Sequence, residues 1–123
     1  MAINFYANRP RHKDNTTVLM GYGQQAYMQL FGNLIAHKVG NAVIFNLCGW
    51  DSTTTRDRLN ALGIPLRKHR GRLLWDMYGD GSEVKEISTR GEYMVELEVA
   101  KKLHRRILGI TDWPNKDLRK VDI

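Results

Sequence analysis

The chain has 123 residues, enough for one domain with a single hydrophobic core and too few for two domains of ordinary size. A composition of 42% hydrophobic and 26% charged residues argues against a disordered chain. Nineteen Lys and Arg residues against thirteen Asp and Glu residues give a formal charge of +6 and a pI near 9.7. A small domain this basic is expected to meet a polyanion: DNA, RNA or an acidic protein surface.

Residues 2–8 predict a short edge strand, and the basic stretch 9–15, which holds Arg9, Arg11 and Lys13 around a proline, predicts a loop. Four β-prone runs follow, separated by glycine-containing turns, one of them at residues 40–41. These runs are residues 16–21, 26–31, 33–39 and 42–48. Their short spacing predicts an antiparallel meander. A helical turn within residues 24–31 is an open alternative, because that stretch also contains good helix formers.

Cys48 is the only cysteine, so an intramolecular disulfide is excluded. It lies in an apolar run, which predicts a buried and unreactive thiol. No apolar stretch reaches the length required to cross a bilayer, and the first residues lack an apolar signal core. We therefore expect a cytoplasmic protein without a membrane partner.

A short helix is predicted over residues 53–62. Asp51 or Ser52 can cap its first turn, and Gly63 can adopt the left-handed conformation that ends it. Helical spacing places Thr55, Leu59 and Leu62 on one buried face. Arg56 and Asn60 then point outward, where such side chains can contact phosphates and base edges.

A β-hairpin is predicted over residues 64–76, with its turn at Arg70 and Gly71. Its tip is strongly basic, since four cations fall within residues 67–72. They are Arg67, Lys68, Arg70 and Arg72.

Downstream, residues 83–88 alternate polar and apolar side chains and predict a half-exposed strand. Residues 92–108 predict a longer helix with Lys102, Arg105 and Arg106 on its outer face. The first residues of this segment also alternate, which leaves a strand there as an alternative. Residues 110–123 predict a C-terminal extension. The whole chain predicts a single α+β domain, with a mainly antiparallel sheet, spanning residues 1–123.

Three motifs carry a resemblance: Gly-Tyr-Gly at residues 21–23, Gly-Asn-Ala-Val-Ile at 40–44, and Trp-Asp-Ser-Thr-Thr-Thr-Arg-Asp-Arg-Leu-Asn at 50–60. The chain resembles a loose group of small tailed-bacteriophage proteins that share a Tyr-Gly turn and a Thr-Thr-x-Arg-x-x-Asn helix. The resemblance covers about half of the chain. It implies a viral origin and the host-cell cytoplasm as the place of action, and it implies no particular mechanism.

The clustering of cations predicts that the protein binds nucleic acid without being an enzyme. The predicted contact residues are Arg56, Asn60, Arg67, Lys68, Arg70, Arg72, Lys102, Arg105 and Arg106. Aromatic side chains that can stack on unpaired bases exist, but their strand positions place them more often in the core. They are Tyr22, Tyr27, Trp50 and Trp75.

Two alternatives stay open. A basic viral protein can inhibit a host or defence protein by covering an acidic surface. Asp76, Glu83 and Lys85 also resemble the Asp…Glu-x-Lys arrangement of Mg²⁺-dependent nucleases, in which two carboxylates hold the metal. The spacing of the four histidines builds no zinc site, and no motif for a cofactor is present, so no metal and no cofactor are predicted.

Overall fold

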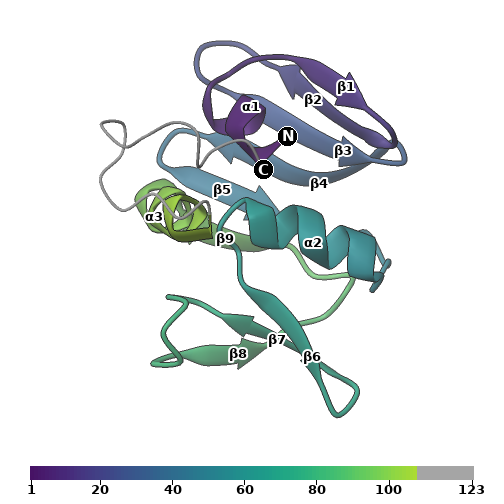
Figure 1. The fold of residues 1–123 in the computed structure, drawn as a ribbon, viewed down its shortest axis with the longest axis vertical. Helices are drawn as coiled ribbons and strands as arrows, with labels where there is room; N and C mark the ends of the chain where they lie inside the picture. Colours follow the sequence, from purple (N-terminus) through teal and green to yellow (C-terminus); the bar gives the residue numbers. More distant parts are fainter. Residues whose placement is uncertain (108–123) are drawn as a thin grey trace.

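The larger of two antiparallel sheets contains six strands, in the order β1-β2-β3-β4-β5-β9. The computed structural model describes residues 1–107, and Figure 1 shows their arrangement. The strands of this sheet are β1 (Arg11–Lys13), β2 (Thr16–Met20), β3 (Ala26–Leu30), β4 (Asn33–Val39), β5 (Ala42–Phe45) and β9 (Tyr93–Glu96). Strands β2 to β5 form the predicted meander, so the segment 26–31 is a strand and the helical alternative is not formed.

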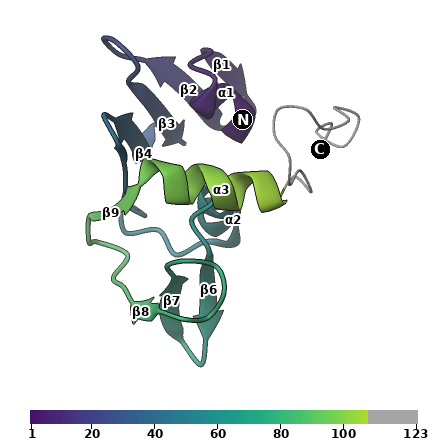
Figure 2. The same ribbon diagram turned by 90° about the vertical axis from the view of Figure 1, so that its left-hand side faces the viewer.

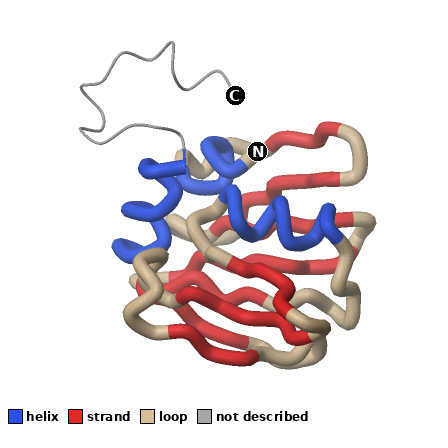
Figure 3. Tube along the Cα trace, turned by 60° about the horizontal axis from the view of Figure 1, so that its bottom comes forward, coloured by secondary structure: helices blue, strands red, loops and turns tan. Residues whose placement is uncertain are grey.

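The smaller sheet has three strands in the order β6-β7-β8. They are β6 (Leu66–His69), β7 (Arg72–Asp76) and β8 (Val84–Glu86). Three helices, α1 (Ala2–Tyr6), α2 (Thr53–Ala61) and α3 (Leu97–Ile107), complete the described chain. Figure 3 shows the helices grouped on one side of the molecule. The α+β class is confirmed, and none of these helices is long and apolar enough to span a membrane.

Buried aromatic rings connect the two sheets. The Phe45 ring of β5 meets the Trp75 ring of β7 edge to face, with 5.0 Å between centroids, and it lies 5.6 Å from the Tyr93 ring of β9. Phe45 and Trp75 are 1% and 3% exposed. The apolar residues of both sheets thus form one continuous core.

Both predictions for the N-terminal segment are wrong. Residues 2–8 contain the helix α1, because Ala2 and Phe5 lie one helical turn apart and both bury their side chains against the sheet. Arg11–Lys13 form the edge strand β1 instead of a loop. All three side chains of β1 are exposed, so no apolar pattern marks the strand in the sequence. Backbone pairing with β2 defines it, together with a side-chain hydrogen bond of 2.6 Å between His12 Nδ1 and Thr17 Oγ1.

The predicted helix over residues 92–108 begins later than expected. Tyr93–Glu96 form strand β9, the alternative left open by the sequence, and Val95 pairs with Val43 in the core. The helix α3 starts at Leu97 and is described as far as Ile107. The predicted extension over residues 110–123 lies outside the described residues.

Gly63, which follows the end of α2, lies directly against the backbone of α3. Its φ of +90° is a left-handed conformation, as predicted for the end of α2. A Cβ atom at this position would lie 2.0 Å from the Ala100 carbonyl oxygen and 2.7 Å from the His104 amide nitrogen of α3. Both neighbours are helix backbone, which cannot move aside without shifting α3.

We therefore expect Gly63→Ala to lower the free energy of unfolding by about 2–4 kcal/mol, from the left-handed backbone together with overpacking. Gly71→Ala is the matched control, because Gly71 has a φ of +79° but nothing within 4 Å of a Cβ atom. The control should lose only about 1 kcal/mol. Urea unfolding of both variants measures the difference, and equal losses would contradict the contact with α3.

Candidate nucleic-acid interface

The predicted basic hairpin is formed by β6 and β7, and its tip extends away from the larger sheet (Figure 1). His69 pairs with Arg72 across the turn, and the two residues between them, Arg70 and Gly71, have φ values of +52° and +79°. Two positive values define a type I′ turn, whose twist matches that of the strands. The four predicted cations of this hairpin are all exposed.

Two of these four cations are ion-paired with carboxylates of the protein itself. Lys68 Nζ donates a hydrogen bond to Asp51, and the Arg72 guanidinium contacts the Glu86 carboxylate, with Nε to Oε2 at 3.1 Å. Within residues 1–107, Arg67 and Arg70 have no salt bridge. The charge that the hairpin offers to a partner is therefore concentrated on Arg67 and Arg70.

The two predicted residues of α2 lie beside the hairpin, as expected, but both hold the fold together. Arg56 is half-buried and donates to the Asp51 carboxylate. Asn60 Oδ1 accepts the backbone N–H of Leu66, the first residue of β6, at 2.6 Å. The sequence predicted Asp51 or Ser52 as the cap of α2. The cap is Ser52, whose Oγ accepts the Thr55 amide at 3.1 Å, and the actual role of Asp51 was not predicted. Asp51 instead joins α2 to the hairpin.

The three cations predicted on α3 do not form one cluster. Lys102 and Arg106 line a groove beside Tyr78, whereas Arg105 lines a different groove next to Arg9 and α1. Figure 2 shows α3 well away from the tip of the β6–β7 hairpin. The structure thus brings Arg56 and Asn60 to the hairpin and leaves the cations of α3 separate from it.

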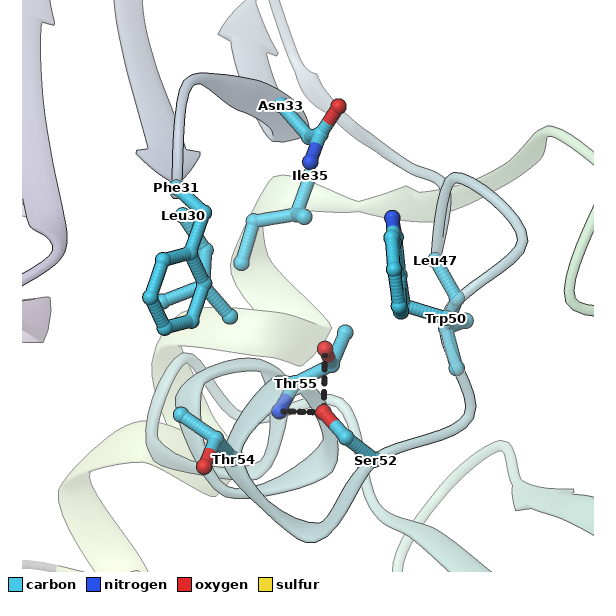
Figure 4. A pocket seen from close by; sticks show the side chains of 9 residues that line it. All are labelled: Leu30, Phe31, Asn33, Ile35, Leu47, Trp50, Ser52, Thr54 and Thr55. Carbon is cyan, nitrogen blue, oxygen red and sulfur yellow. Dashed lines mark hydrogen bonds between the residues drawn. The ribbon is translucent and has the colours of Figure 1, made fainter.

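An open apolar groove of about 530 Å³ lies between the β3–β4 turn and the start of α2 (Figure 4). It is lined by Leu30, Phe31, Asn33, Ile35, Leu47, Trp50, Ser52, Thr54 and Thr55. Trp75 is in the core, as expected from its strand position, but Trp50 is 62% exposed at the rim of this groove. The sequence carries one signal for these exposed rings. In Phe31-Gly32 and in Gly49-Trp50, an aromatic residue stands next to a glycine of a turn.

The residues of the nuclease alternative have contacts of their own. Both carboxylate oxygens of Asp76 accept the backbone N–H of Gly81, at 3.1 and 3.2 Å. Lys85 Nζ lies 5.5 Å from the centre of the Tyr93 ring, a cation–π contact. Across residues 1–107, no three His, Cys, Asp or Glu side chains form a group able to hold a metal ion.

The Asp51 carboxylate makes two ion pairs, and these lower its pKa. Partial burial raises the pKa of this carboxyl, but hydrogen bonds from Lys68 and Arg56 together with their charges outweigh burial, so the pKa lies below its ordinary value of 3.8. A lowered pKa in the folded state means that the carboxylate stabilises the fold fully above pH 3.8. This contribution is lost as the pH falls through the folded pKa.

We expect Asp51→Asn to lower the free energy of unfolding by about 1–2 kcal/mol at pH 7 and by less at about pH 2.5, because the wild-type carboxyl loses its charge as the pH falls through its folded pKa. Urea unfolding at the two pH values measures this. Glu86→Gln is the control, because its ion pair with Arg72 is exposed and should contribute little. A loss for Asp51→Asn that does not change with pH would contradict the assignment.

Comparison with models of known protein families gives a match. The family model of the Kyanoviridae Gp96 protein, a phage family, matches residues 1–78, the segment from α1 through β7 that contains both the groove and the hairpin. Searches of curated proteins and of solved structures find no match. The match confirms the expected phage origin. Because it spans more than half of the sequence, the chain belongs to the Kyanoviridae Gp96 family.

Proposed function

We propose that this protein binds nucleic acid through the tip of the β6–β7 hairpin. The observation that carries the proposal is the pair Arg67 and Arg70, exposed and without a salt bridge within residues 1–107. An arginine side chain presents five N–H donors, which suits phosphate oxygens. The type I′ turn and the antiparallel pairing hold both side chains on a short, rigid hairpin, so little order has to be gained on binding.

The neighbouring Asp51 cluster supports the same partner. One carboxylate faces two cations, Arg56 and Lys68, which leaves a charge of +1 beside the hairpin. Both cations keep N–H donors that the carboxylate does not use. The formal charge of +6 for the whole chain adds a long-range attraction to a polyanion.

Replacing Arg67 and Arg70 together by Gln should weaken binding to DNA or RNA and flatten its salt dependence. Each lost phosphate contact reduces the slope of log K against log salt by about 0.7–0.9, so the double variant should lose about 1.4–1.8. Arg72→Gln is the matched control, because this guanidinium is already paired with Glu86. Fluorescence anisotropy with a labelled oligonucleotide between about 50 and 200 mM salt measures both slopes.

An unchanged slope in the double variant would contradict this assignment. The other candidate partner, an acidic surface on a host or defence protein, uses the same cations. It would be favoured if wild-type protein ignores nucleic acid at low salt but retains a partner from nuclease-treated host lysate. In either case we propose that the protein acts in the cytoplasm of the infected host.

We also propose that the binding is not accompanied by cleavage. The Asp76 carboxylate already accepts the Gly81 amide with both oxygens, which gives it a structural role in the turn after β7. Incubation of DNA and RNA with the wild-type protein and Mg²⁺ should therefore leave both intact. Cleavage that disappears in Asp76→Ala would establish the nuclease alternative instead.

A further inference from the structure

The apolar groove holds two exposed aromatic rings that nothing in the hairpin proposal uses. Phe31 is 65% exposed and belongs to the β3–β4 turn, and Trp50 belongs to the loop before α2. Figure 4 shows the two rings on opposite sides of the groove, with Ile35 and Thr55 between them. Its volume of about 530 Å³ falls within the range of roughly 300–1,000 Å³ found for ligand pockets.

The walls of the groove are apolar and rigid, and its rim offers hydrogen bonds. Leu30, Ile35 and Leu47 are at most 3% exposed and form a fixed apolar surface. Asn33 and Thr54 add an amide and a hydroxyl that can meet the edge of a ring ligand. None of the nine lining residues is charged.

Each ring belongs to a turn in which a residue other than glycine has a positive φ, Phe31 itself in one turn and Cys48 in the other. Phe31 has a φ of +52° and Gly32 a φ of +80°, so a phenylalanine occupies the first position of a type I′ turn, where Asn, Asp or Gly is usual. Cys48 and Gly49 have φ values of +57° and +83°, and the Trp50 amide donates to the Leu47 carbonyl to close this second turn. Strain of this kind in bulky side chains concentrates at binding sites.

The charge next to the groove indicates what occupies it. Asp51 stands in the chain between two lining residues, Trp50 and Ser52, and its carboxylate holds Arg56 and Lys68. A cluster with a charge of +1 therefore adjoins an uncharged aromatic groove. A ligand that is flat and aromatic at one point and anionic beside it fits both features, and an unpaired nucleotide has this chemistry.

We propose that the groove takes an unpaired base of single-stranded nucleic acid between Phe31 and Trp50, while Arg56 and Lys68 contact the adjoining phosphate. This inference rests on the proposed function and adds a preference to it, because a base inside a duplex cannot enter the groove. The hairpin cations then contribute to the affinity for any nucleic acid, and the groove selects single strands.

The test compares the binding of a labelled single-stranded oligonucleotide with that of a duplex of the same sequence. Phe31→Asn and Trp50→Leu should each weaken single-strand binding about 10-fold and leave duplex binding within about twofold, the loss expected for one stacked base. Tyr22→Leu is the matched control, because this tyrosine is 94% exposed but does not line the groove. It should change neither affinity.

Phe31→Asn separates loss of binding from loss of folding. Asparagine tolerates a φ of +52° better than phenylalanine, so this variant should melt at the same temperature as wild type or higher. Weaker single-strand binding in a protein of equal or greater stability would support the groove as a base site.

Wild-type affinity for single strands in both groove variants would overturn this inference, while the weakened binding of the Arg67 and Arg70 variant would still support the proposed function. Failure of wild-type protein to bind any oligonucleotide would overturn both. The base site would also be overturned if wild-type protein captures a partner protein from nuclease-treated lysate and both Phe31→Asn and Trp50→Leu lose it. The occupant of the groove would then be an apolar side chain of that partner.

Discussion

The close approach of Gly63 to α3 is the constraint on which the described structure depends. A side chain of any size at this position would meet the backbone of α3, so only glycine allows the end of α2 to lie against that helix. The contact fixes the position of α2 relative to both sheets, because β6 begins three residues later and α3 continues directly from β9 of the larger sheet. The hydrogen bond from the Leu66 amide to Asn60 then sets the start of the hairpin.

Two carboxylates neutralise part of the positive charge of the hairpin, so its four cations are not equally available to a partner. Asp51 and Glu86 engage Lys68 and Arg72, which leaves Arg67 and Arg70 as the hairpin cations that no described carboxylate neutralises. Exposed ion pairs contribute little to stability, so the pair at Glu86 mainly reduces local charge. The Asp51 pairs are less exposed, and they hold Arg56 and Lys68 on one carboxylate, that of the residue between Trp50 and Ser52 of the groove.

Local patterns in the sequence predicted much of the fold and less of the interface. The meander, the helix α2 and the hairpin turn at Arg70 and Gly71 follow from alternation, capping and glycine, all readable within a few residues. The helix α1 and strand β1 were missed because one is a single short turn of helix and the other has no apolar side chain. The Asp51–Lys68 ion pair joins residues 17 apart in the chain, and the groove joins residues 30–35 to residues 47–55. A single sequence carries no signal for such contacts.

Within residues 1–107, five residues other than glycine have positive φ values, and their identities divide them into two groups. Asn8 and Asp14 are of the types that tolerate this conformation, so they require no explanation beyond turn geometry. Phe31, Cys48 and Arg70 are not, and each costs about 1 kcal/mol relative to Asn or Gly. Against a typical stability of about 5–15 kcal/mol, three such positions are a substantial cost.

Phe31 and Arg70 are themselves exposed, and Cys48 precedes the exposed Trp50 by two residues. In the view of Figure 1 the three turns lie toward the same side, and the groove and the Asp51–Lys68 pair connect them in space. Packing does not require an exposed ring or guanidinium at a strained position, since asparagine would satisfy the turn at lower cost. The Phe31 ring and the Arg70 guanidinium are groups that the proposed binding of nucleic acid would use, for stacking on a base and for contact with phosphate.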